Sequence, residues 1–191
     1  YAQDDSPPGS PPSSLIGPGN LVAGLDTGVW VEGTDYVVTG DRVSGNATGV
    51  VVNGVRSRVI GNAIFGQVVG LPGTGNGLRI FSGAGPVEVW HNVLDGNAGD
   101  GLRSDAVPLD VRNDLFTGNA GYGVRAQAGS FGPGAFGWNG YWANALGAVN
   151  PLQLATGPTD LLADPLYVDR PAADFRLSPP SPAIDAGTAT G

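Results

Sequence analysis

Three arginines in equivalent sequence contexts are the side chains best suited to binding a charged ligand. They occur in the segments Gly-Leu-Arg-Ile, Gly-Leu-Arg-Ser and Gly-Val-Arg-Ala, and two earlier segments with the same opening glycine carry Trp and Val instead. If these segments are equivalent strands, their third residues form one outward row, which consists of Trp30, Val51, Arg79, Arg103 and Arg125. Asp105 is expected to lie between Arg103 and Arg125, within reach of both. Such a row can bind the carboxylates of an acidic polysaccharide or partner, although arginines paired with one aspartate are also an ordinary protein surface.

Catalytic chemistry has weaker support in the sequence. General acid and base catalysis in a hydrolase needs carboxylates about 5 to 10 Å apart. The aspartates are dense in one part of the chain but fall on different turns and faces, namely Asp95, Asp100, Asp105, Asp110 and Asp114. The chain has one histidine, His91, and no cysteine, so neither a catalytic triad nor a zinc site is indicated. The sequence therefore points to no catalytic residue, no metal site and no cofactor.

A repeat must position the arginine row. A nine-residue pattern of Val, a turn residue, Asp or Asn, an apolar residue and Gly begins at Val38, Val59, Val89 and Val111, and degenerate copies begin at residues 17 and 136. Successive starts are 21, 21, 30, 22 and 25 residues apart. Short β-branched stretches bounded by Gly and Asn, without a helical pattern, predict an all-β solenoid. We expect one parallel β-helix of about six turns, in which equivalent residues stack at a spacing of about 4.8 Å.

The repeat also predicts which residues stack. Three inward apolar columns are expected, which contain Val38, Val59, Val89 and Val111, then Val43, Ile64, Leu94 and Phe116, then Val29, Val50, Leu78, Leu102 and Val124. A polar column at a turn is expected to be structural, because short polar side chains there bond to neighbouring backbone. Its members are Asn20, Asp41, Asn62, Asn92 and Asp114.

The chain resembles the right-handed parallel β-helix repeat proteins, the pectate-lyase-like superfamily, over roughly residues 15 to 188. The most specific part of the resemblance is the ending, with DPLYVD at residues 164–169, DFRLS at 174–178 and SPAIDAG at 181–187, which looks like that of secreted bacterial members. For a lyase acting on uronates, the resemblance implies a basic residue and a calcium cluster of carboxylates. Glu32 and Asp105 are three turns apart, about 14 Å at the strand spacing, so no calcium site is expected there.

Composition narrows the class of protein. The 191 residues carry a formal charge of −8, with no cysteine, methionine or lysine. This charge disfavours nucleic acid and anionic lipid as partners, and no apolar run reaches the length of a membrane span. Because the chain does not begin with Met, we expect a processed mature form or a fragment, with residues near a signal cleavage site at its start. A secreted, extracellular or cell-surface location follows from that expectation.

The two ends of the solenoid raise the question of capping. Residues 1–14 form a Pro/Ser-rich extension, residues 15–144 the repeats, and residues 145–191 a Pro-rich cap or strap expected to pack on the last turns through leucines that include Leu152 and Leu162. Open strand edges invite another chain. Candidate residues for end-to-end assembly are Tyr1, Pro7, Pro8, Pro11, Pro12, Leu15, Ile16, Leu166, Tyr167, Phe175 and Ile184. Trp138, Tyr141 and Trp142 suit either a sugar-stacking platform or an apolar cap.

Two functions remain open on the sequence. The first is a non-catalytic structural role, as a β-helix building block of a cell-surface or extracellular assembly, such as a filament formed by self-association. The alternative is a module that binds or cleaves an acidic polysaccharide through the arginine row. The two differ in what they predict: self-association places the functional residues at the ends, whereas polysaccharide binding places them on one sheet.

Overall fold

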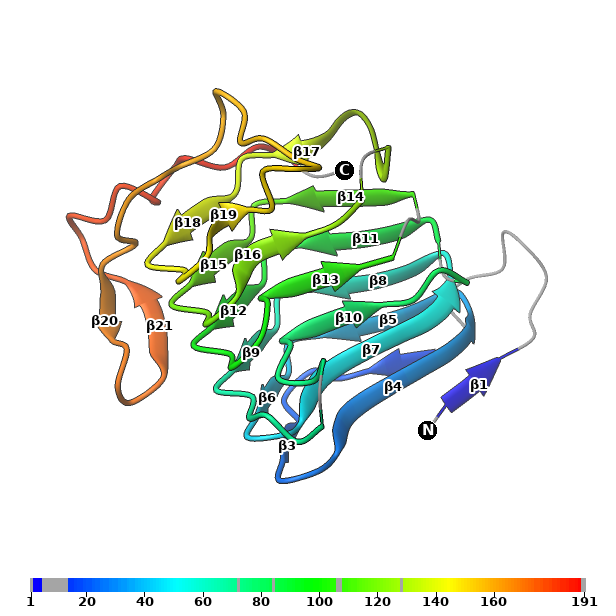
Figure 1. Cartoon of the computed structure of the whole chain (residues 1–191). Helices are drawn as coiled ribbons and strands as arrows, with labels where there is room; N and C mark the ends of the chain where they lie inside the picture. The colour runs from blue at the N-terminus through cyan, green and yellow to red at the C-terminus, as the bar shows by residue number, and fades with distance from the viewer. Residues whose placement is uncertain are drawn as a thin grey trace.

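The chain winds through three parallel β-sheets, and each full turn adds one strand to each sheet (Figure 1). The computed structural model describes residues 2–4, 14–71, 73–83, 85–105, 108–127 and 129–189. The described residues include no helix, and so none that could cross a membrane. The expected all-β solenoid of about six turns is thereby confirmed.

We call the three sheets A, B and C. Sheet A contains β1 (Ala2–Asp4), β4 (Thr27–Thr34), β7 (Thr48–Val55), β10 (Leu78–Ile80), β13 (Leu102–Ser104), β16 (Tyr122–Arg125) and β19 (Gly147–Val149). Sheet B contains β2 (Ser14–Ile16), β5 (Tyr36–Thr39), β8 (Ser57–Ile60), β11 (Val87–Trp90), β14 (Leu109–Arg112) and β17 (Phe131–Gly137). Sheet C contains β3 (Leu21–Ala23), β6 (Arg42–Ser44), β9 (Ala63–Phe65), β12 (Val93–Asp95), β15 (Leu115–Thr117) and β18 (Gly140–Trp142).

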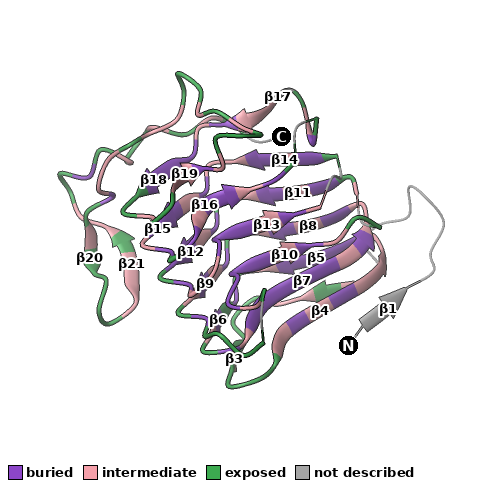
Figure 2. Cartoon of the chain, in the orientation of Figure 1, coloured by how far each residue is buried: buried purple, intermediate pink, exposed green. Residues whose placement is uncertain are grey.

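The core is built from the three apolar columns that the repeat predicts. Strand registers pair equivalent residues turn by turn in all three sheets, as in Val59 with Val89, Leu94 with Phe116 and Leu78 with Leu102. These side chains are buried along the length of the molecule (Figure 2). Because side chains alternate along a strand, the residues between them point outward and are free to carry polar and charged groups.

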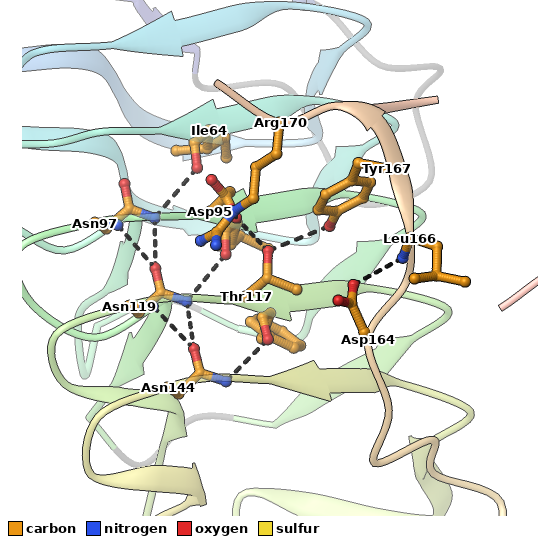
Figure 3. A network of polar contacts seen from close by, with 12 residues as sticks. Ile64, Asp95, Asn97, Thr117, Asn119, Asn144, Asp164, Leu166, Tyr167 and Arg170 are labelled. Carbon is orange, nitrogen blue, oxygen red and sulfur yellow. Dashed lines mark hydrogen bonds and ion pairs between the residues drawn. The ribbon is translucent and has the colours of Figure 1, made fainter. Parts of the chain in front are cut away.

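The turns between strands are held by two ladders of polar side chains. In the first, the backbone N–H of each member donates to the side chain of the next at 2.7 to 3.0 Å, through Asn20, Asp41, Asn62, Asn92, Asp114, Asn139 and Asp160. The second ladder joins Asn46, Gln67, Asn97, Asn119 and Asn144 in the same way. Figure 3 shows Asn97, Asn119 and Asn144 of this ladder. Each ladder thus gives a hydrogen-bond acceptor to backbone N–H groups at the turns, which burial would otherwise leave unpaired.

The chain after β19 forms one further partial turn and then a strap. Leu161 pairs with Gly140 and so extends sheet C by a single bridge. The strap is the segment 164–189, and it contains an antiparallel hairpin of β20 (Tyr167–Asp169) and β21 (Asp174–Leu177) (Figure 1). Because β20 and β21 pair with each other, the backbone groups of this Pro-flanked segment are hydrogen-bonded without joining a parallel sheet.

The strap packs beside sheet C rather than across the end of the solenoid. Arg170 Nε donates to Asp95 Oδ1 at 2.8 Å, the Phe175 ring lies 5.3 Å from the Phe65 ring, and Arg42 Nη2 donates to the Ala173 carbonyl at 2.9 Å. The strap therefore reaches back as far as β6, beyond the last turns where it was expected.

Two leucines expected to pack in this region point to solvent instead. Leu152 is 91% exposed and Leu162 is 63% exposed, whereas Leu154 packs against the core. The expectation for Leu152 and Leu162 was wrong because the strap covers the side of sheet C and leaves the surface around them uncovered.

Candidate functional site

The outer face of sheet A carries the arginine row in the register that the repeat predicts. Adjacent strands pair Trp30 with Val51, Val51 with Arg79, Arg79 with Arg103 and Arg103 with Arg125. Their strand neighbours on either side are buried, so the five side chains stand together on the outer face. The structure thus brings together the ligand-binding candidates that were inferred from the repeat.

Arg79 is held in place by a carboxylate and an aromatic ring. It forms an ion pair with Asp105, and its guanidinium carbon lies 4.8 Å from the centre of the Phe81 ring. Only 15% of the Arg79 side chain is exposed. A guanidinium fixed over a ring and against a carboxylate has little freedom to bind a ligand by itself.

Arg125 is fixed in a similar way by a different acid. Its Nε donates to Asp100 Oδ2 at 2.7 Å, and its guanidinium carbon lies 5.0 Å from the centre of the Tyr122 ring. The Asp100 side chain is only 4% exposed, and its Oδ1 also accepts the Tyr122 backbone N–H at 2.8 Å. Asp100 therefore serves as the anchor of Arg125 and of the start of β16.

The expected position of Asp105 between Arg103 and Arg125 was wrong. Asp105 follows the end of β13, where the chain leaves the sheet, and its carboxylate meets Arg79 of the preceding turn. The site beside Arg125 is taken by the buried Asp100, which lies just before β13. Asp105 and Asp100 thus neutralise the two outer arginines of the row.

Arg103 is left as the available cation of the row. Within the described residues it forms no ion pair and no hydrogen bond, and it is only partly buried between Arg79 and Arg125. Its two fixed neighbours define the space around it, so a carboxylate that approached the row would meet an unpaired guanidinium in a preorganised setting.

The first part of the same face is aromatic. The Trp30 ring lies 6.0 Å from the Phe81 ring, tilted by 40°, and Trp30 Nε1 donates to Glu32 Oε2 at 3.4 Å. Phe81 in turn supports Arg79. The face therefore runs from an aromatic pair to an unpaired guanidinium, a combination able to contact both the apolar and the anionic parts of a sugar acid.

Several grooves lie between the strap and the solenoid. The first, of about 200 Å³, is lined by His91, Asn113, Trp138 and Thr188 among others. The second, of about 300 Å³, is lined by Trp142, Asp164 and Tyr167 among others, and a more open one of about 560 Å³ lies between Arg42 and Phe175. In the second groove Thr117 contacts the Tyr167 hydroxyl at 3.2 Å (Figure 3). Burial raises the pKa of the Tyr167 hydroxyl, which therefore stays protonated and able to donate a hydrogen bond.

The remaining sequence candidates differ in their exposure to solvent. His91 is exposed at a turn with a φ of 58°, Tyr141 is buried and stacks on Phe116 at 5.4 Å, and Trp142 is 43% exposed. Among the described residues no group of three or more His, Cys, Asp or Glu side chains could hold a metal ion.

The assembly candidates divide between the strap and the first turn. Tyr167 and Phe175 pack against each other at 5.2 Å inside the strap, and Leu166 and Ile184 are 37% and 44% exposed. Leu15 is 60% exposed, while Ile16 packs against the core. The other candidates, Tyr1, Pro7, Pro8, Pro11 and Pro12, lie outside the described residues.

Sequence reasoning did not identify Asp100 as part of the row, and it missed the second ladder. A signal was present in both cases, because Asn46, Gln67, Asn97 and Asn119 each close the nine-residue pattern, and Asp100 precedes the glycine that opens β13. The extension of the first ladder to Asn139 and Asp160 could also be predicted from the sequence, because these residues are 21 apart.

The fold is shared with a known structure. The periplasmic alginate epimerase AlgG matches 74% of this chain with a TM-score of 0.58 and 16% sequence identity, and pectate lyase Pel9A matches 89% with a TM-score of 0.45 and 14% identity. The chain covers 37% of the epimerase and 65% of the lyase. No protein-family model and no curated protein sequence matches the chain. The likeness to the epimerase places the chain among β-helix folds and, at this identity, shows the fold alone.

Proposed function

We propose that the outer face of sheet A binds an acidic polysaccharide, with Arg103 as the main contact to a carboxylate of the polymer. The observation that supports this role is the difference between Arg103 and its neighbours. Arg79 and Arg125 are each anchored by an aspartate and an aromatic ring, whereas Arg103 between them has no ionic partner within the described residues. An unpaired guanidinium between two arginines that are already neutralised favours a ligand that brings a carboxylate to this one position.

Binding is favoured over cleavage because the two carboxylates beside the row are already engaged. Asp105 pairs with Arg79 and Asp100 pairs with Arg125, so neither is free to act as a general acid or base in this arrangement. The structural likeness to an alginate epimerase makes alginate, a polymer of uronic acid units, the first ligand to test. A location outside the cytoplasm fits such a ligand, and that epimerase is periplasmic.

The test compares Arg103→Gln with a variant that changes the net charge equally on another face. Arg58 lies on the outer face of sheet B, paired in register with Glu88, so Arg58→Gln is the matched control. Loss of a charged hydrogen bond is worth about 1.5 to 3 kcal/mol, which corresponds to a fall in affinity of about 10-fold to 100-fold. We expect this loss for Arg103→Gln, measured by titration calorimetry with alginate, and little change for Arg58→Gln.

Two controls separate specific binding from general attraction. Uncharged dextran should not bind, and the affinity for alginate should fall as salt is raised, because the contact is ionic. If wild type and Arg103→Gln bind alginate equally, or if neither binds polyuronates at all, then sheet A is not the binding surface that we propose.

A further inference from the structure

One outward row of sheet C lies beside the strap. Strand registers place Phe65, Asp95, Thr117 and Trp142 side by side in successive turns, each at the last position of its strand. The residue before each of them is buried in the core, so the row faces outward. The strap therefore meets this row from the outside of the solenoid.

The strap gives a partner of matching chemistry to three members of the row. Phe65 meets an aromatic ring, Asp95 a guanidinium and Thr117 a hydroxyl (Figure 3). The partners are, in the same order, Phe175, Arg170 and Tyr167. Trp142 is the exception, because within the described residues no ring or guanidinium stacks on its indole and its indole N–H donates no hydrogen bond. The row thus ends in a tryptophan, 43% exposed, whose face is available to another molecule.

Trp142 borders the second of the grooves between the strap and the solenoid, which we call the Trp142 groove. Its volume is about 300 Å³, and its lining also includes Thr117, Asp164, Tyr167 and Asp169. Sites for small ligands commonly measure about 300 to 1,000 Å³. The Trp142 groove therefore has room for a small ligand, with an aromatic face and several oxygen atoms around it.

The Tyr167 side chain contributes an oxygen that can accept a hydrogen bond. Thr117 donates its only hydroxyl proton to Asp95, so the proton between Thr117 and Tyr167 comes from Tyr167. Burial raises the pKa of the Tyr167 hydroxyl, which therefore keeps this proton. Its oxygen then has lone pairs left for a hydroxyl of a ligand.

Two carboxylates add further acceptors to the Trp142 groove. Asp164 Oδ1 accepts the Leu166 backbone N–H at 2.8 Å, and Asp169 Oδ1 accepts the Ala172 backbone N–H at 3.2 Å. Neither aspartate forms an ion pair within the described residues, so each keeps Oδ2 for a ligand. The cation of the lining, Arg170, is already paired with a buried carboxylate. An acidic ligand would therefore meet like charge here and no unpaired cation among the lining residues.

We infer that the Trp142 groove binds a neutral sugar unit, with the sugar ring stacked on the Trp142 indole and its hydroxyls donating to the oxygen atoms of the groove. A sugar ring combines an apolar C–H face with hydroxyls around its edge, and the groove combines an indole face with acceptors beside it. The charge of the groove disfavours the uronic acids proposed for sheet A. Because the two sites lie on different sheets, this inference is independent of the proposed function.

The test titrates the full chain with neutral hexasaccharides of glucose, mannose, galactose and xylose, and with an alginate hexasaccharide as the charged probe. We expect a neutral probe to bind, and Trp142→Ala and Asp164→Asn each to lower its affinity by about 10-fold or more in titration calorimetry. Trp30→Ala removes an outward tryptophan of sheet A and is the matched control, with unchanged affinity expected. Arg103→Gln should also leave the neutral probe unaffected, and Trp142→Ala should leave alginate binding unaffected.

A spectroscopic measurement keeps the test valid if Trp142→Ala is unstable. Trp142→Phe keeps an aromatic ring, and the indole N–H signal that is missing from its NMR spectrum identifies Trp142 in the wild type. The neutral probe should shift that signal. The inference would be overturned if no neutral hexasaccharide bound, if binding left the Trp142 signal in place, or if folded Trp142→Ala bound the neutral probe as tightly as wild type.

Discussion

Asp114 offers a quantitative test of the first ladder. Its Oδ1 accepts the backbone N–H and the side-chain N–H of Asn92, at 2.7 and 2.8 Å. Its Oδ2 is buried without a hydrogen-bond partner in the described structure. In Asn62, Asn92 and Asn139 the corresponding atom is Nδ2, which donates to the carbonyl of a buried valine one turn earlier, at 2.9, 2.8 and 3.1 Å. An aspartate can imitate this contact only when its carboxyl group is protonated.

The pKa of the Asp114 carboxyl should therefore be raised in the folded protein. Burial raises it well above the ordinary 3.8, nearby Asp110 raises it further, and the hydrogen bonds from Asn92 only partly oppose this. Below pH 3.8 the carboxyl is protonated in both the folded and the unfolded chain, so stability carries no penalty from this group. As pH rises above 3.8 the unfolded chain ionises first, and the free energy of unfolding falls by up to about 1.4 kcal/mol per pH unit until the folded pKa is passed.

Asp114→Asn removes this penalty and supplies the missing donor. We expect the variant to be more stable than wild type at neutral pH by at least about 1 to 3 kcal/mol, the cost of an unsatisfied buried polar group, and the difference to shrink toward pH 3. Urea denaturation from pH 3 to pH 8 measures it, with Asp185→Asn on the exposed strap as the control. A variant less stable than wild type at neutral pH, or a gain that is equal at pH 4 and pH 8, would refute the reasoning.

Two further predictions concern the strap and the core. Arg170→Met removes the cation that pairs with Asp95, whose side chain is 11% exposed. It should lower the free energy of unfolding by about 1 to 3 kcal/mol and speed proteolytic cleavage of the strap. Arg176→Met breaks an exposed ion pair and should change both quantities little. Phe116→Ala should lower the free energy of unfolding, measured by urea denaturation, by about 3 to 5 kcal/mol. The reason is that the ring is fully buried and stacks on Tyr141 at 5.4 Å. A loss below about 1 kcal/mol would show that neighbouring residues fill the space.

The sequence predicts this fold well where the contacts join equivalent residues of successive turns. The row that contains Arg79, Arg103 and Arg125 was assigned correctly because parallel strands pair in register and the repeat counts that register directly. The same holds for the apolar columns, since a shift of one residue would turn every buried side chain to the surface.

Contacts that depend on loops could not be predicted in this way. The repeat aligns Asp100 with Asn76 and Tyr122 of the neighbouring turns, but it does not indicate that the Asp100 side chain pairs with Arg125. The contact between Asp95 and Arg170 joins residues 75 apart, one in a repeat and one in the strap, so no period relates them. Glycine and proline content indicated turns in both regions, but turn residues do not determine which distant strand a strap will meet.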